Sequence, residues 1–290
     1  MFPVHLNLGF TVLYFYEGLY FAISVIIGYS WSKRRVTSYY DSIQYENFIF
    51  WIVVGLIIGG RISHFVFWEN NVFLDNPLEI FKFWQGGISV IGGIIGGITA
   101  AIVYCRLKKF DFWYVFALAS PALLLAQGVG RIGCFLNGDA FGINTNMPWG
   151  IKLPKFGMML PSFETIRDLP SYAWSWSFQR GLVDLNSQFS VPLHPAQLYE
   201  AAGDFFLMTV ILLILKLKID KDRLYRFIFF VYVLFYSTLR FIIEFFRADR
   251  KGISSYGLSD LQFFLGIISF VSIIFIIYVI FIKNRKTREL

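Results

Sequence analysis

The sequence predicts an all-α, polytopic membrane protein with seven transmembrane helices. Its mean hydropathy is +0.60, 57% of its residues are hydrophobic and only 16% are charged. A soluble protein of 290 residues cannot bury that much apolar surface. A lipid bilayer accepts it, because a hydrocarbon layer of about 30 Å needs about 20 apolar residues in each helix that crosses it.

Seven windows of the sequence are apolar over about that length. They lie at about 11–31, 46–67, 88–105, 112–128, 201–217, 226–246 and 258–282. The first window is followed by the basic residues Lys33 to Arg35 and preceded by none, which is the reverse of a cleavable signal peptide, so we expect an uncleaved span. Between the fourth and fifth windows we expect an extracytoplasmic loop or cap at 129–198, within a single membrane domain, 1–290.

The positions of lysine and arginine predict the orientation of the spans, since short segments rich in these residues stay in the cytoplasm. The basic helix ends carry Lys33, Arg34 and Arg35; Arg106, Lys108 and Lys109; Lys216, Lys218, Lys221, Arg223 and Arg226; and Lys283, Arg285, Lys286 and Arg288. The amino terminus is therefore expected outside and the carboxyl terminus inside. The net charge of +7 is spread over these ends rather than gathered in one stripe, so we expect no nucleic-acid partner.

Two further patterns are excluded. Gly128 to Gly133 matches the dinucleotide fingerprint GxGxxG, but it follows an apolar helix rather than a buried strand, so we reject that interpretation. Cys105 and Cys134 are expected on opposite sides of the membrane and imply neither a disulfide nor a metal framework.

The informative polar residues are the arginines in or beside the apolar windows, because a centrally placed arginine costs at least about 2.5–3.5 kcal/mol on insertion scales. Arg61 lies in the second window, Arg131 just after the fourth, and Arg240, with Glu244, late in the sixth. These three windows run outward, so their arginines are expected to converge toward the outer leaflet. Glu244 is the one clear acidic partner in the membrane, and unpaired guanidinium groups bind anions.

Seven more polar residues are expected at the same level. They are Tyr16, His64, Asn137, Asp139, His194, Gln197 and Arg247. His64 shares a helix face with Arg61, and Arg247 shares one with Glu244, because residues three apart on a helix are neighbours. With the arginines, these residues predict a site for the headgroup of an anionic phospholipid.

Each feature also has a purely structural interpretation. Glycine pairs such as those in Gly92–Gly97 commonly let membrane helices pack closely. The Arg240–Glu244 pair can be a neutralised structural pair, and His64 or His194, taken singly, can be an ordinary interface histidine. These interpretations leave the convergence of three arginines unexplained.

Five segments, in order, resemble the prolipoprotein diacylglyceryl transferase family. They are GGRISHFVF from Gly59, WQGGISVIGGIIGG from Trp84, GRIGCFLNGDAFG from Gly130, HPAQLYE from His194 and LRFIIEFFR from Leu239. The third is similar to the family signature GR-x-G-N-F-x-N-x-E-x-x-G. The resemblance runs over nearly the whole chain.

The resemblance implies a seven-helix protein of the bacterial cytoplasmic (inner) membrane with a site that faces outward and no cofactor. It implies phosphatidylglycerol as donor and, as acceptor, the lipobox cysteine in a prolipoprotein signal peptide. The diacylglyceryl group passes to the cysteine thiol as a thioether, and glycerol phosphate is released. The positions that match the family are Tyr16, Arg131, Asn137, Gly142, Arg240 and Glu244.

We expect Arg131 and Arg240 to hold the phosphate and Glu244 to orient Arg240. The substrate is then positioned by Tyr16, Arg61, Asn137, Asp139, Gly142, His194, Gln197 and Arg247. The chain departs from the family at three positions, with Asp139 for glutamate, Cys134 for asparagine and Ile91 for the histidine of the third helix.

Isoleucine cannot take the thiol proton, so three alternatives stay open. His64 can take the thiol proton instead, or His194 can. Alternatively, the arginines can lower the pKa of the thiol until water suffices to take the proton. A diverged homologue that binds lipid without transfer is a further possibility. So is a lipid transporter or receptor, although we see neither internal repeats nor polar groups in the cytoplasmic half.

Overall fold

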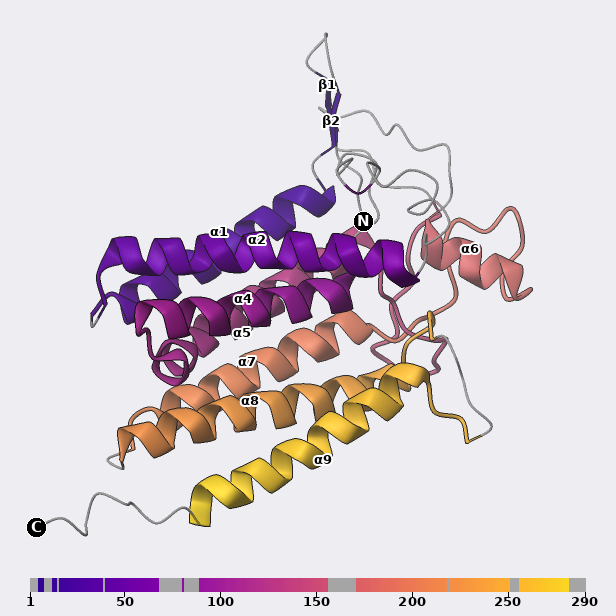
Figure 1. Cartoon of the computed structure of the whole chain (residues 1–290). Coiled ribbons are helices and arrows are strands. Elements are labelled where there is room, and N and C mark those ends of the chain that lie inside the picture. Colours follow the sequence, from indigo (N-terminus) through magenta and orange to yellow (C-terminus); the bar gives the residue numbers. More distant parts are fainter. Residues whose placement is uncertain are drawn as a thin grey trace, which may run out of the picture. The chain divides into compact units, whose positions relative to one another are not determined.

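The structure is a computed structural model that describes residues 5–7, 12–14, 16–38, 40–67, 80, 89–155, 171–217, 220–250 and 256–281. The regular secondary structure of these residues is helical apart from two three-residue strands, β1 (His5–Asn7) and β2 (Val12–Tyr14), which pair antiparallel (Figure 1). A helix overlaps each of the seven predicted windows. These are α1 (Tyr16–Val36), α2 (Ser42–Phe67), α4 (Val90–Lys108), α5 (Phe112–Asn137), α7 (Ala196–Ile214), α8 (Lys221–Glu244) and α9 (Asp260–Phe281).

Five of the described helices are long and apolar enough to cross a membrane, namely α2, α5, α7, α8 and α9. The chain is therefore an α-helical, multi-pass membrane protein. It forms two compact units: unit 1 is 1–32 together with 120–290, and unit 2 is 33–119. The boundaries between the units fall inside α1 and α5.

Unit 2 is built on the pairing of α2 with α4, which lie side by side (Figure 1). Glycines on both helices face each other: a Cβ atom on Gly55 would lie 2.6 Å from the Gly96 carbonyl oxygen, and one on Gly59 would lie 2.8 Å from the Gly96 Cα. The two backbones are in contact, which only glycine allows. The structural interpretation of the Gly92–Gly97 cluster is confirmed.

In unit 1, α8 packs between α7 and α9 (Figure 1). Gly203 of α7 gives room to Leu239 of α8, whose Cδ1 would lie 2.8 Å from a Cβ at that position. On the other side of α8, the Ser237 and Ser269 hydroxyls hydrogen-bond at 2.8 Å. These contacts fix the faces that α8 turns toward α7 and toward α9.

Helix α5 is longer than the sequence predicted, because it continues nine residues past position 128 to Asn137. Arg131 therefore lies within the helix rather than after it, and our placement was wrong. The apolar window ended where glycines and an arginine appear, but neither residue type interrupts backbone hydrogen bonding. The helix ends at Gly138, which has φ +79° and donates its N–H to the Cys134 carbonyl at 2.9 Å.

The described parts of 138–195 form a small irregular segment of unit 1, held by isolated β-bridges. Bridges join Asn144 and Ile151 to Leu193, and a short helix, α6 (Tyr172–Gln179), packs nearby. The side chains of its core are Phe141, Leu153, Ala173 and Leu193. The predicted segment 129–198 thus includes the end of α5 and the start of α7.

Candidate functional site

A buried carboxylate on α7, Glu200, lies at the centre of three guanidinium groups. Its side chain forms ion pairs with Arg131 of α5, with Arg240 of α8 (Nη1 to Oε1, 3.2 Å) and with Arg247 (Nη1 to Oε1, 3.5 Å), which follows α8. Glu200 is only 4% exposed. We call these four residues, with Glu244, the Glu200 cluster.

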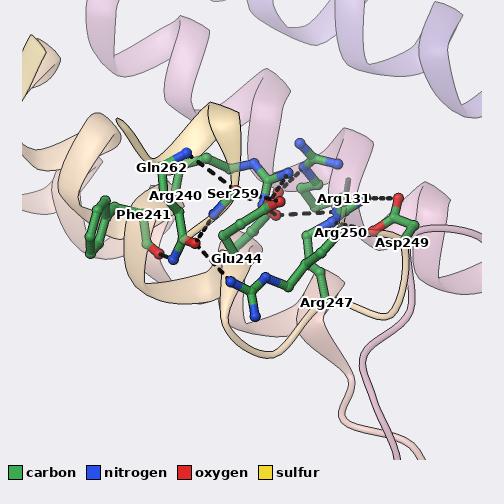
Figure 2. A network of polar contacts seen from close by, with 10 residues as sticks. Arg131, Arg240, Phe241, Glu244, Arg247, Asp249, Arg250, Ser259 and Gln262 are labelled. Carbon is green, nitrogen blue, oxygen red and sulfur yellow. Dashed lines mark hydrogen bonds and ion pairs between the residues drawn. The ribbon is translucent and has the colours of Figure 1, made fainter. Parts of the chain in front are cut away.

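Arg240 is held by two carboxylates at once. Its Nη2 lies 3.0 Å from Oε2 of Glu244, one helical turn further along α8, while its Nη1 contacts Glu200. Ser259 donates its hydroxyl to the other Glu244 oxygen at 3.4 Å. Figure 2 shows Arg240, Glu244 and Ser259 pointing toward one another from α8 and the segment before α9. The Arg240 guanidinium is therefore oriented before any ligand arrives.

Arg247 is fixed by a bidentate pair with Asp249. Arg247 Nε donates to Oδ1 at 2.8 Å and Nη2 donates to Oδ2 at 2.6 Å (Figure 2). Partial burial alone would raise the pKa of Asp249, but these hydrogen bonds from Arg247 lower that pKa below its ordinary value. Burial opposes the charge of Arg247, yet hydrogen bonding to Asp249 raises the pKa of Arg247.

The buried charges around Glu200 are nearly balanced, because α7 buries a further carboxylate, Asp204, one turn beyond Glu200. Three guanidinium groups contact two buried carboxylates, Glu200 and Glu244, while the Asp249 side chain is 56% exposed. Arg131 is the most accessible of the three arginines, with 28% of its side chain exposed. Arg131 is therefore the guanidinium group of the cluster that an arriving anion can reach most readily.

Gly142 brings a loop against Arg247. Its N–H donates to the His194 carbonyl at 2.9 Å, and the next residue, Ile143, donates to the Phe246 carbonyl at 2.8 Å. A Cβ on Gly142 would lie 2.6 Å from the Cβ of His194 and 2.7 Å from the carbonyl oxygen of Phe246, so a larger residue would push this loop away from the residue before Arg247. Gly142 thus has a backbone-packing role in this structure.

His194 and Gln197 also contact this region. The His194 Nδ1 lies 3.0 Å from the Tyr199 hydroxyl, which accepts a 2.8 Å hydrogen bond from the Trp149 indole. Burial lowers the pKa of His194. Gln197 donates its amide to the backbone carbonyl of Asp139. Both predicted residues therefore join the end of α5 and the following loop to the start of α7.

The other predicted residues divide into two groups. Arg61 and His64 lie in unit 2, where Arg61 is buried, donates to the Ile80 carbonyl at 3.0 Å and stacks over the Phe65 ring at 4.7 Å. The side chains of Tyr16 and Asn137, like that of Ile91, lie outside the described residues. Of the three arginines expected to converge, Arg131 and Arg240 meet, and Arg247 is the third cation of the cluster.

Sequence reasoning missed the centre of the cluster. The prediction that Glu244 is the one clear acidic partner within the membrane is wrong, because α7 buries both Glu200 and Asp204. The fifth window began at residue 201, whereas α7 begins at Ala196, so Glu200 appeared to precede the span. The signal was present: Gln197, Glu200 and Asp204 recur at spacings of three and four and so share one helix face.

Comparison with known proteins bears on this arrangement. A family model described as prolipoprotein diacylglyceryl transferase matches residues 3–283. A protein of Proteus mirabilis named phosphatidylglycerol--prolipoprotein diacylglyceryl transferase is 31% identical over 281 residues, which cover 93% of this chain and 90% of the relative. Relatives with the same name include one from Salmonella choleraesuis, 33% identical over 84% of this chain and 80% of its own, and one from Geobacter sulfurreducens, 30% identical over 84% and 82%. The chain belongs to the prolipoprotein diacylglyceryl transferase family.

Proposed function

We propose that the chain transfers the diacylglyceryl group of phosphatidylglycerol to the lipobox cysteine of prolipoproteins, and that the Glu200 cluster binds the phosphate. Family membership supports the reaction and both substrates. The observation that carries the site is the meeting of Arg131, Arg240 and Arg247 on one buried carboxylate.

The chemistry needs positive charge where the cluster supplies it. The cysteine sulfur forms a bond to the terminal glycerol carbon of the diacylglyceryl group. The bond from that carbon to the phosphate oxygen breaks, and glycerol phosphate leaves with the electron pair. Negative charge grows on the phosphate, and preorganised guanidinium groups stabilise such charge. We assign this role to Arg131 and Arg240.

Glu200 and Glu244 act on the arginines rather than on the lipid. Glu244, fixed by Ser259, holds Arg240 in one orientation. Glu200 keeps three like charges within reach of one another when no phosphate is bound. Preorganisation of this kind lowers the cost of rearrangement at the moment of reaction.

The thiol proton needs an acceptor, since a thiol of pKa about 8.5 is mostly protonated at neutral pH. His194 is engaged at Nδ1 by Tyr199, which supports a positioning role for it. The proposal that His64 accepts the proton rests on the sequence, in which it shares a helix face with Arg61. We expect His64→Ala to abolish transfer and His194→Ala to reduce it only in part. Unchanged turnover in His64→Ala would instead indicate that the arginines lower the pKa of the thiol and that water takes the proton.

The topology completes the proposal. We propose seven spans in one membrane domain, 1–290, with the amino terminus outside the bacterial inner membrane, the carboxyl terminus in the cytoplasm and 129–198 on the outer side. The basic helix ends support this orientation. In unit 1, the proposed headgroup site also includes three further predicted residues, Tyr16, Asn137 and Asp139. Cysteine accessibility to a membrane-impermeant thiol reagent, with single cysteines in 129–198 and near the carboxyl terminus, tests the orientation.

The decisive experiment uses the purified full chain with labelled phosphatidylglycerol and a lipobox peptide. A gain in mass on the peptide cysteine, lost in Arg240→Gln and kept in Arg106→Gln, is expected. Arg106 is an exposed arginine at the end of α4 and controls for the loss of one positive charge. Lipid movement across the bilayer with no peptide adduct would instead identify a transporter.

A further inference from the structure

A second feature of the molecule, in unit 2, shares no residue with the Glu200 cluster. An apolar groove of about 710 Å³ lies on α2 and α4. Its walls include Trp51, Ile58, Ile62, Val103 and Leu107, and Lys108 stands among its lining residues. The groove plays no part in the function proposed above.

The groove exists because the two helices touch through their backbones. Where α2 meets α4, the groove is lined by residues without side chains, namely Gly55, Gly59 and Gly96. Larger residues stand on either side of them, so the surface is recessed along this line. The walls are outward-facing: Trp51 is 51% exposed and Val103 is 49% exposed. Helix α2, which carries Trp51, is apolar enough to span a membrane, and exposed apolar side chains of this size on such a helix face the lipid.

The length of the groove matches one leaflet. From Gly96 to Lys108 the axis of α4 rises about 18 Å at 1.5 Å per residue. Half of a hydrocarbon layer of about 30 Å is about 15 Å. A single acyl chain of a lipid in one leaflet can therefore lie along the groove with its headgroup near Lys108.

The charge at the end of the groove selects the kind of headgroup. Lys108 lies at the carboxyl end of α4 and is exposed, as are Arg106 and Lys109 on the same end. The lining contains no acidic residue. Basic residues at this depth attract anionic lipids rather than zwitterionic ones.

We propose that this groove binds one acyl chain of an anionic phospholipid whose phosphate contacts Lys108, in the leaflet at the basic end of α4. The lipid held there is a bound neighbour of the enzyme and not its substrate, because the Glu200 cluster contributes nothing to the groove. The glycines that pack α2 on α4 thus also shape a lipid site.

The test is photo-crosslinking of the full chain in nanodiscs. The probes are phosphatidic acid and phosphatidylcholine with identical acyl chains, each with a diazirine near the chain end. We expect the anionic probe to label peptides from α2 and α4, and the zwitterionic probe to label them several-fold less. Equal labelling by the two probes would overturn the proposal.

Three variants separate this site from general attraction of lipid to a basic helix end. Lys108→Gln should lower anionic labelling of these peptides about fivefold, as expected for one basic residue at a membrane surface. Arg106→Gln removes the same charge at the same helix end but does not line the groove, so it should leave labelling unchanged. Val103→Trp should fill the groove and remove labelling.

Two further results would contradict the proposal. One is an equal fall in labelling in Lys108→Gln and Arg106→Gln, which would mean that surface charge alone attracts the lipid. The other is unchanged labelling in Val103→Trp. Because these side chains are exposed, each variant should keep the thermal unfolding profile of the parent chain, and a variant that does so reports on lipid binding alone.

Discussion

The two compact units bury opposite kinds of residue. Unit 1 buries charged side chains on α7 and α8, with Glu200 and Asp204 on the first and Glu244 on the second. Unit 2 joins α2 and α4 through glycine backbones, and Arg61 is its one buried charged residue among those described. Because buried charge in a membrane is costly and glycine packing is not, the buried charges of unit 1 favour it as the source of the proposed phosphate-binding arginines, whereas α2 and α4 of unit 2 are joined by close packing.

Replacing Glu200 should have the largest effect on transfer and on the stability of unit 1. Glu200→Gln leaves three guanidinium groups without their shared carboxylate, and removing one partner of a buried ion pair costs about 3–5 kcal/mol. We expect more than about 100-fold loss of transfer and a lower unfolding temperature. The control is Glu46→Gln, which removes an exposed carboxylate paired with Lys33 in unit 2 and should change neither measurement.

The geometry of Arg240 gives the next largest effect. Its two terminal nitrogens contact different carboxylates, which a lysine cannot reproduce because its ammonium is a single point charge. Arg240→Lys should therefore lower kcat by about 100-fold. Arg247→Lys loses a bidentate pair with a half-exposed aspartate and should lower it less. Equal losses in the two variants would mean that net charge, and not orientation, matters.

Glycine substitutions test the close packing of α2 on α4 in unit 2. Gly55→Ala places a methyl group 2.6 Å from the Gly96 carbonyl oxygen and must separate α2 from α4, at a cost of about 1–3 kcal/mol. Gly97→Ala is the matched control, because its nearest neighbours would lie at 3.7 Å, an ordinary contact distance. Unfolding in a denaturing detergent should separate the two variants. If both destabilise the protein equally, backbone contact is not what holds the pair together.

Composition and spacing predicted most of the fold because membrane helices must be long and apolar whatever they pack against. A helix overlaps each of the seven windows, and the packing role of Gly92–Gly97 is confirmed. The helix ends were less predictable. Hydropathy ended the fourth span near residue 128, whereas the backbone continues to a left-handed glycine at position 138.

The site was predictable in kind but not in its centre. The cost of burying arginine identified Arg131 and Arg240 as partners in one cluster, and the structure places both on Glu200. Glu200 itself was missed because hydropathy began the fifth span one residue after it. The structure describes Arg61 only within unit 2, so its convergence with the other arginines stays a prediction.

The smallest expected effect concerns the pH dependence of unit 1. The pKa of Asp249 is lower in the folded chain than the value of about 3.9 in an unfolded one, because Arg247 hydrogen-bonds to its charged form. The unfolded chain therefore binds the proton more readily. The stabilisation from this pair is complete above pH about 4 and disappears as the pH falls through the folded value.

Asp249→Asn should flatten the acid side of a plot of unfolding temperature against pH, while the exposed Asp184→Asn should leave that side unchanged. Because the Asp249 side chain is 56% exposed, solvent screens the pair and the difference should be small. A large acid-side effect would mean that Asp249 also supports Glu200 through Arg247. The exposed Asp249 and the buried Glu200 would then be coupled, and Asp249→Asn should reduce transfer as well as stability in acid.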